Sequence, residues 1–244
     1  HFLESAVLVT VTLMYRTEGM KLCLSQIRMY KRMLQSILKI GLPAGFEAIM
    51  YSISNIIVQV SINNFGVDTM AAWTAYSKID FIFWMINSAF GISVMTFVGQ
   101  NYGAGKWDRI RRGTKICLGM ALISAVSVSI ILMSAERFLF GIFVNDAGVV
   151  EIGIRMMNVI APAYLLFAFI EVFSGALRAQ GAVVVSTLIT MVGICVLRMI
   201  WVTLVAAHGT LEQVIICYPI TWAAGALAMS IYYIYKQRKI FQAR

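Results

Sequence analysis

Six long runs of apolar residues, separated by short polar connections, dominate this 244-residue sequence. A helix that crosses the hydrocarbon core of a bilayer needs about 20 such residues. Helices that are apolar on every side require lipid or a bundle interior around them. We therefore predict an all-α, polytopic membrane helical bundle. Its spans are expected over Gly41–Ile62, Tyr76–Val98, Ile116–Ala135, Met156–Leu177, Val183–Ala207 and Val214–Tyr235.

The composition supports a membrane protein and argues against a nucleic-acid partner. Hydrophobic residues make up 60% of the chain and charged residues only 13%, with a mean hydropathy of +0.83. A soluble domain has about 25% charged residues. The net charge of +9 arises mainly from lysines and arginines in the short connections between apolar runs, as the positive-inside rule expects. The lipid bilayer is therefore the expected partner, and nucleic acid is not.

The basic residues also predict the orientation of the bundle. They concentrate in Arg16–Ile40, in Gly99–Lys115, at Arg178 and in the tail after Tyr235. The positive-inside rule places these segments in the cytoplasm. The connections expected on the opposite side carry more acidic residues, namely Asp68, Glu136, Asp146, Glu151 and Glu212, beside Arg137 and Arg155.

The segments before the first full span have a different pattern. Phe2–Tyr15 is apolar but short for a span, so we interpret the chain as starting inside a helix of a longer protein. Arg16–Ile40 combines basic residues with apolar residues at helical spacing, which predicts an amphipathic helix on the membrane surface. Pro43 is expected in the first turn of its helix, and Pro162 is expected to kink its span.

No constellation of reactive side chains predicts an enzyme or a metal site. The four cysteines are far apart and form no metal-ligand spacing. Neither histidine has a candidate partner nearby in the sequence. We expect no catalytic residue, no metal ligand set and no cofactor. The cysteines and histidines considered are Cys23, Cys117, Cys195, Cys217, His1 and His208.

Four sequence motifs resemble one transporter family. The segment Thr-Phe-Val-Gly-Gln-Asn-Tyr-Gly-Ala-Gly-Lys at 96–106 resembles the loop after the eighth helix of the multidrug and toxic compound extrusion (MATE) transporters. The segments 41–45 (Gly-Leu-Pro-Ala-Gly), 175–181 (Gly-Ala-Leu-Arg-Ala-Gln-Gly) and 196–199 (Val-Leu-Arg-Met) resemble motifs of the seventh, tenth and eleventh helices, in that order. Together they extend the resemblance over nearly the whole chain.

The resemblance implies a twelve-helix exporter built from two six-helix lobes. Residues 1–15 then correspond to the truncated end of the sixth helix, 16–40 to a cytoplasmic amphipathic linker between the lobes, and 41–244 to the C-terminal lobe. Its partner is the N-terminal lobe of the same protein, and its location is the bacterial inner membrane.

The resemblance further implies antiport of small hydrophobic cationic drugs against H⁺ or Na⁺ by alternating access. The chain alone is expected to be inactive. Two alternatives remain open, a lipid-linked oligosaccharide flippase of the same superfamily and a structural fragment that does not transport.

Polar residues inside spans are costly in hydrocarbon and are therefore candidates for function. Glu47, Tyr51, Asn55 and Gln59 follow one another at four-residue steps and form a polar stripe that should face the bundle interior or a cavity. The alternative role of this stripe is hydrogen bonding between helices. Glu171 is expected at a depth similar to that of Glu47. We hypothesise that both carboxylates face one cavity and that one of them titrates or binds the coupling cation.

Three more candidates lie in other spans. Asp80 and Asn87 share one face of the second span. Arg198 lies deep in the fifth span and needs a partner that the sequence does not identify. A Na⁺ site remains unassigned. Methionines and aromatic residues suit either a pocket for flat hydrophobic cations or ordinary packing against lipid.

Overall fold

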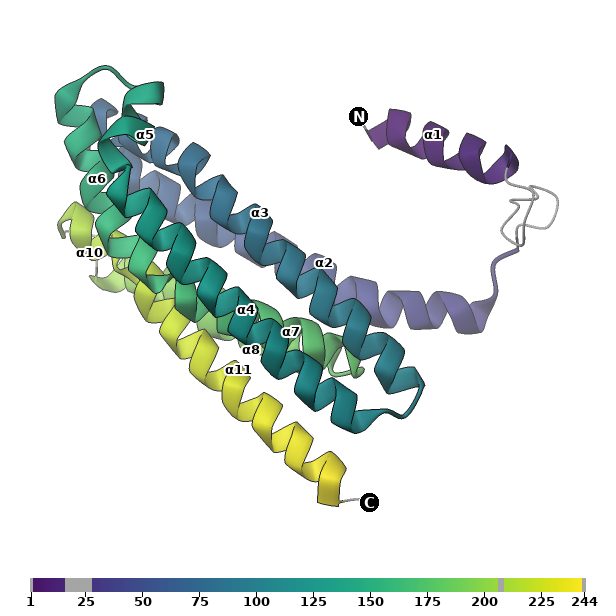
Figure 1. Cartoon of the computed structure of the whole chain (residues 1–244). Coiled ribbons are helices and arrows are strands. Elements are labelled where there is room, and N and C mark those ends of the chain that lie inside the picture. Colours follow the sequence, from purple (N-terminus) through teal and green to yellow (C-terminus); the bar gives the residue numbers. More distant parts are fainter. Residues whose placement is uncertain (1, 16–27, 206–208, 243–244) are drawn as a thin grey trace. The chain divides into compact units, whose positions relative to one another are not determined.

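The computed structural model describes residues 2–15, 28–205 and 209–242, which are helical almost throughout (Figure 1). The chain forms two compact units, His1–Gly41 and Leu42–Arg244. The smaller unit contains α1 and the first residues of α2. The helices are α1 (Phe2–Tyr15), α2 (Lys31–Asn63), α3 (Val67–Gly103), α4 (Trp107–Ser134), α5 (Glu136–Phe143), α6 (Ala147–Ile160), the 3₁₀ turn η2 (Ala161–Ala163), α7 (Tyr164–Ala179), α8 (Val183–Thr190), the π-helical η3 (Met191–Val196), α9 (Leu197–Ile200), the π-helical η4 (Trp201–Val205), α10 (Leu211–Ile215) and α11 (Cys217–Gln242).

Six helical segments of the described residues are long and apolar enough to cross a membrane, which confirms the predicted all-α membrane bundle. The chain is a multi-pass membrane protein. The segments are Lys31–Asn63, Val67–Gly103, Trp107–Ser134, Ala147–Ala179, Val183–Leu204 and Leu211–Ile240.

The helix that contains the first predicted span begins earlier than expected, and the predicted place of Pro43 in its first turn is wrong. α2 begins at Lys31 and runs through Gly41 without a break, so Pro43 lies inside this helix and not in its first turn. Residues 31–40 carry their own helical periodicity, which allows the amphipathic segment and the span to form one helix. Residues 16–27 of the predicted surface helix lie outside the described residues.

The predicted loop Gly99–Lys115 is much shorter than expected. α3 continues to Gly103 and α4 begins at Trp107, so the polar character of these residues reflects exposed helix ends. The backbone reverses at Gly105, whose φ is +67°. Such a left-handed conformation favours glycine because it has no Cβ. The Lys106 amide then closes the turn by donating to the Asn101 carbonyl at 2.9 Å.

The expected kink at Pro162 is confirmed. The helix changes to a 3₁₀ turn over Ala161–Ala163 and resumes at Tyr164. Proline cannot donate the next helical hydrogen bond, so a regular α-helix is interrupted there. The hydroxyl of Ser129 on α4 donates to the Ala161 carbonyl at 2.8 Å, which ties the kink to a neighbouring helix.

Two other predicted boundaries also change. The expected connection Glu136–Arg155 contains α5 and the first turns of α6. Asp146 caps α6 by accepting hydrogen bonds from the backbone amides of Gly148 and Val149, at 2.7 and 3.1 Å. In the expected span Val183–Ala207, two π-helical segments flank the four-residue helix α9.

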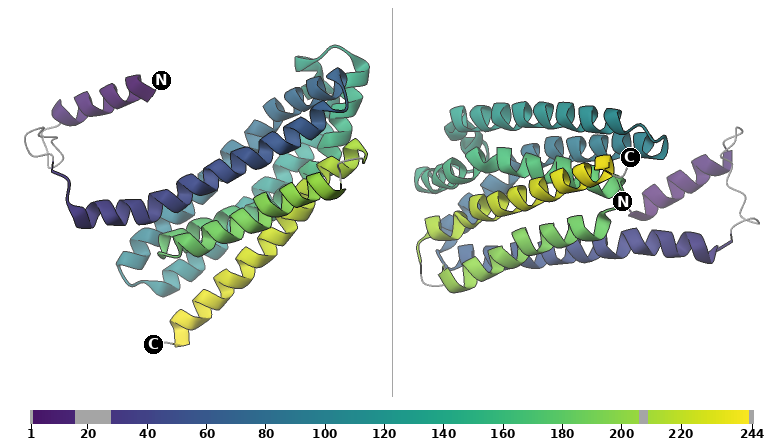
Figure 2. Two further views of the ribbon diagram at one scale, coloured as in Figure 1. Left: turned by 180° about the vertical axis from the view of Figure 1, so that it is seen from behind. Right: turned by 90° about the horizontal axis from the view of Figure 1, so that it is seen from below.

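The core of the larger unit forms where α3 and α7 pack closely. A Cβ placed on Gly175 of α7 would lie 2.7 Å from the Gly91 carbonyl oxygen of α3 and 2.8 Å from Val94 Cγ1. The two backbones therefore touch at these glycines, as small residues permit in membrane bundles. The right-hand view of Figure 2 shows α4 on one side of this core and α8 on the other.

The two ends of the larger unit differ in charge. The α3–α4 turn, the α7–α8 turn and the C-terminal end of α11 lie at one end, whereas α5 and α10 lie at the other (Figures 1 and 2). The first end carries Lys106, Arg109, Arg111, Arg112, Lys115, Arg178, Lys236, Arg238 and Lys239. Within the larger unit, the three segments that the sequence assigns to one side of the membrane, namely Gly99–Lys115, Arg178 and the end of α11, thus lie together.

We predict that Gly175→Ala destabilises the bundle by about 1–3 kcal/mol, because the added methyl group meets the backbone of α3. Gly119→Ala is the matched control, since nothing lies within 4 Å of a Cβ at that position of α4. The control should be neutral or gain up to about 1 kcal/mol in helix propensity. Thermal unfolding of the full-length protein in detergent compares the two, and equal melting temperatures would contradict the proposed close contact.

Candidate functional site

Two cavities lie beside the polar face of α2. The larger, here called the aromatic cavity, has a volume of about 390 Å³ and the smaller, the carboxylate cavity, about 310 Å³. Tyr51 of α2 lines both. Cavities of 300–1,000 Å³ are of the size that binds small molecules.

Among the described residues, Asp80 of α3 supplies the only acidic side chain in the wall of the aromatic cavity. The Tyr164 hydroxyl donates to Asp80 Oδ1, and the Trp84 indole nitrogen donates to Oδ2 at 2.5 Å. Tyr76 and Tyr164 are joined by a further hydrogen bond of 3.1 Å between their hydroxyls. No lysine or arginine among the described residues forms an ion pair with Asp80. Neutral donors thus hold a carboxylate at the wall of the cavity and leave its charge available to a cation.

Aromatic rings form much of the remaining wall. Trp73 contacts Tyr218 with ring centroids 5.9 Å apart, and Tyr218 contacts Trp222 at 5.6 Å. Trp84 and Trp222 meet edge to face at 6.1 Å. Because each ring touches its neighbours, the wall is a connected aromatic surface. The face of such a ring carries negative potential and attracts cations.

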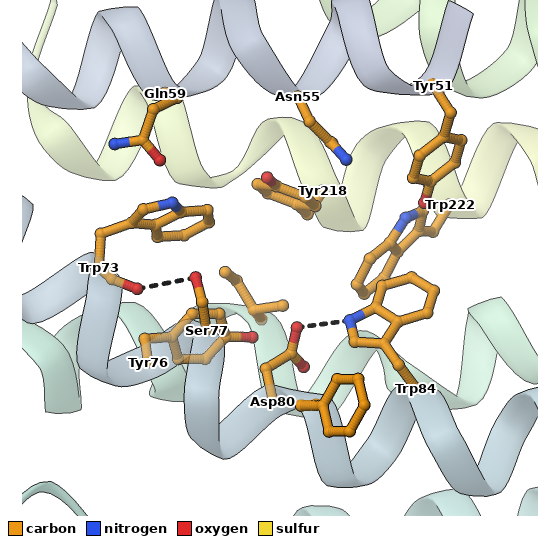
Figure 3. A pocket seen from close by; sticks show the side chains of 12 residues that line it. Tyr51, Asn55, Gln59, Trp73, Tyr76, Ser77, Asp80, Trp84, Tyr218 and Trp222 are labelled. Carbon is orange, nitrogen blue, oxygen red and sulfur yellow. Dashed lines mark hydrogen bonds between the residues drawn. The ribbon is translucent and has the colours of Figure 1, made fainter. Parts of the chain in front are cut away.

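The polar stripe of α2 faces this surface. Figure 3 shows Tyr51, Asn55 and Gln59 on one side of the cavity, opposite Asp80 and the rings of α3. The Gln59 side-chain nitrogen donates to Asn63 Oδ1 at 2.8 Å. Three of the four residues in the predicted stripe therefore line the aromatic cavity.

Arg198 has partners that the sequence did not identify. Its side chain is fully buried, and Nη1 donates to Asn55 Oδ1 at 3.0 Å. The guanidinium carbon lies 4.3 Å from the ring centre of Tyr218 and 5.7 Å from that of Tyr51. Nε and Nη2 make no hydrogen bond to any described residue. The positive charge thus lies directly behind one wall of the aromatic cavity.

Glu47 is the most strongly bonded carboxylate of the candidate set. Arg178 Nη2 donates to both Glu47 oxygens at 2.7 Å, and Thr187 Oγ1 donates to Oε2 at 2.8 Å. The side chains of Arg178 and Glu47 are 28% and 13% exposed, so the ion pair is shielded from solvent. These bonds connect α2 to both α7 and α8.

Glu171 lines the same carboxylate cavity as Glu47 and Arg178. Its carboxylate lies against α3, since a Cβ on Gly91 would be 2.1 Å from Glu171 Oε1. In the part of the chain that the structure describes, Glu171 makes neither a hydrogen bond nor an ion pair. The cavity therefore holds one bonded and one unbonded carboxylate.

The structure separates the remaining candidates. Asn87 is buried in α3 but lines neither cavity. The sequence did not predict Thr187 or Tyr164 as carboxylate partners, and no short-range pattern indicates them. The sequence contained a weak indication of the role of Arg178, because helical spacing places it on the same face as Glu171. Within the described ranges, no three histidine, cysteine or acidic side chains gather as metal ligands.

Comparison with known proteins identifies this arrangement as a familiar fold. The MatE family model matches residues 43–204. The chain is similar to the "Probable multidrug resistance protein YoeA" of Bacillus subtilis, with 25% identity over 219 residues, 88% of this chain and 47% of that protein. It is also 26% identical over 208 residues to the "Probable multidrug resistance protein YpnP" of the same organism, covering 84% and 47% of the two chains.

A solved structure has the same fold at low sequence identity. It is described as the outward-facing conformation of a multidrug resistance MATE family transporter of the MOP superfamily, and it superposes with a TM-score of 0.86 at 15% identity. The superposition covers 98% of this chain and 55% of the other. The chain thus spans about half the length of the relatives that it matches.

We predict that Arg178→Gln destabilises the bundle by on the order of 2 kcal/mol, because Glu47 then keeps its charge without a counter-ion. The double variant Glu47→Gln/Arg178→Gln should lose less than the sum of the two single variants. A double-mutant cycle from thermal unfolding of the full-length protein measures the coupling.

The Arg137–Glu151 pair is the control, since its side chains are 79% and 58% exposed. Exposed pairs contribute about 0–1 kcal/mol. A coupling energy at Glu47–Arg178 no larger than that of the control pair would contradict the bonded geometry.

Proposed function

The chain belongs to the MatE family, and on this premise we propose that it forms part of a secondary active exporter of small hydrophobic organic cations. The transported drug binds in the aromatic cavity, and H⁺ or Na⁺ binds in the carboxylate cavity. Transport, rather than catalysis, is the function that this pair of cavities supports best.

The single observation that carries the proposal is the Asp80 carboxylate in a wall of aromatic rings. A flat organic cation that enters this cavity gains a counter-ion at Asp80 and ring faces at Trp73, Trp84 and Tyr218. A desolvated contact between a cation and a ring contributes about 2 kcal/mol. The hydrogen bonds from Tyr164 and Trp84 fix the carboxylate, so it need not reorganise when the cation binds.

The coupling ion is proposed to bind at Glu47 and Glu171. A proton or a sodium ion on either carboxylate competes with Arg178 for negative charge, because all three residues line one cavity. Loss of the Arg178–Glu47 bonds weakens the attachment of α2 to α7, while the Thr187–Glu47 bond still reaches α8. Since Tyr51 of α2 lines both cavities, this weaker attachment changes the shape of the drug site as well. A ligand that binds one conformation more tightly shifts the population toward it.

The whole exporter is proposed to need a second six-helix lobe in addition to this chain. The drug path then lies between the lobes, and alternating access results from rocking of one lobe against the other. The basic end of the bundle faces the cytoplasm by the positive-inside rule. A bacterial inner membrane is the proposed location.

The alternative functions have less support in the site. A flippase for a lipid-linked oligosaccharide must hold a pyrophosphate, and the described residues in the wall of the aromatic cavity include Asp80 but no lysine or arginine. An intramembrane enzyme needs a nucleophile and a base at matched depth. The serine and threonine hydroxyls that line the carboxylate cavity, Ser174 and Thr190, bond to Ser186 in the described structure and not to a carboxylate that could act as a base. If the variants described below have no effect on efflux, the third alternative, a structural fragment without transport activity, is supported.

Asp80→Asn in the full-length protein should reduce ethidium efflux at least about tenfold, because the charge contact with the cation is lost. Asp68→Asn is the matched control, since Asp68 is an exposed residue at the start of the same helix. Efflux from cells is compared at equal membrane abundance. Unchanged efflux by the Asp80 variant contradicts the proposed drug site.

Glu47→Gln and Glu171→Gln should each abolish or strongly reduce ion-driven efflux, because a neutral amide cannot exchange a proton or balance Na⁺. Glu212→Gln is the control, as its ion pair with Arg155 is exposed and its contribution is small. Addition of sodium at fixed pH identifies which ion drives the cycle. If both cavity variants retain full efflux, the coupling proposal is wrong, even where Asp80→Asn still fails.

A further inference from the structure

A third cavity lies between α3 and α4, away from the two cavities of the transport site. It has a volume of about 370 Å³ and is lined mostly by apolar groups, including Phe90, Phe97, Ile116 and Met120. α4 contributes no residue to the aromatic cavity or to the carboxylate cavity. This cavity, here called the α3–α4 groove, is therefore separate from the transport site proposed above.

A glycine shapes the end of this groove that is nearest the basic turn. A Cβ on Gly113 would lie 2.1 Å from Phe97 Cε1, so the Phe97 ring rests directly on the backbone of α4. From Gly113 the lining continues to Met120, seven residues deeper, which is about 10 Å along the helix. The groove is thus elongated along the direction in which a lipid chain runs.

Basic side chains continue the same face of α4 beyond the groove. Arg109 and Arg112 precede Gly113 and Ile116 by four residues each, so they lie on the helix face that lines the groove. Both side chains are exposed. Lys106, directly before α4, precedes Arg109 by three residues and Gly113 by seven, which places it at the same mouth of the groove. Lys115 has no three- or four-residue relation to the groove residues of α4 and points away from this face. Asp108 precedes Arg112 by four residues, so it lies beside the mouth and offsets part of its positive charge. An apolar channel therefore ends at a positively charged mouth.

We propose that the α3–α4 groove binds an anionic phospholipid, with one acyl chain in the groove and the phosphate on Arg109 and Arg112. The mouth and the channel together match the two chemical parts of such a lipid. A free phosphate uses only the mouth, and a zwitterionic lipid gains less from the positive charges. Each basic residue near an anionic lipid contributes about 1 kcal/mol. The proposal does not depend on the transport site.

Native mass spectrometry can measure the binding of phosphatidylglycerol to the purified full-length protein, and this measurement tests the mouth of the groove. Arg109→Gln/Arg112→Gln should weaken the apparent affinity on the order of 30-fold. Lys115→Gln/Arg238→Gln removes the same charge from positions outside the mouth and should leave the affinity within about twofold of the unmodified protein. Equal losses in the two double variants would overturn the proposal.

A second variant tests the channel while all charges stay in place. Ser93 lines the groove with an exposed side chain, so Ser93→Phe should fill the channel and weaken phosphatidylglycerol binding without unfolding the bundle. Phosphatidylcholine should bind more weakly than phosphatidylglycerol, and glycerol phosphate should not compete with it. Effective competition by glycerol phosphate, no effect of Ser93→Phe, or equal binding of phosphatidylcholine would each contradict the proposal.

Discussion

A charge inside an apolar bundle is costly unless it is bonded to another group, and two such bonds organise the larger unit of the protein. Arg178 joins Glu47, and Arg198 joins Asn55, with bonds of 2.7 and 3.0 Å between helices distant in the sequence. An unbonded charge in such surroundings costs several kcal/mol. These two contacts position α2 beside α7 and α9, and the Thr187–Glu47 bond adds α8. The cavities that open along α2 depend on this position.

The same contacts explain why stability and transport are coupled in the proposed mechanism. The bonds from Arg178 and Thr187 hold Glu47 at one end of the polar stripe, whereas Arg198 holds Asn55 two turns further along. Tyr51 lies between them and lines both cavities. A change of charge at one end of α2 can therefore reach the drug site through a single helix. No long chain of intermediate residues is needed.

Much of the fold was predictable because apolar runs of spanning length have few alternatives in a bilayer. The six spans and the kink at Pro162 followed from run length and from the missing proline N–H. The helix boundaries did not follow, because exposed helix ends are as polar as loops. α3 and α4 extend into the stretch expected to be a loop, and α2 begins ten residues before the expected position. The π-helical segments around Arg198 have no recognisable sequence pattern.

The candidate site was predictable only in part, for a related reason. Spacing along one helix placed Glu47, Tyr51, Asn55 and Gln59 on a common face, and the structure shows these residues lining the cavities. Contacts between helices have no such signal in one sequence. The hydrogen bond from Tyr164 to Asp80 joins residues 84 positions apart, and that from Thr187 to Glu47 joins residues 140 positions apart. The sequence was enough to identify the polar side chains that are costly to bury in a membrane. Their bonding partners could be identified only from the packing of the helices.

The central claim is that an organic cation binds at Asp80 within the aromatic cavity. A cryo-electron microscopy structure of the full-length protein with bound ethidium tests it most directly. The account predicts density for the planar cation beside Asp80, in contact with Trp73 or Trp84. Well-resolved ethidium elsewhere in the protein, with the aromatic cavity empty, would contradict it.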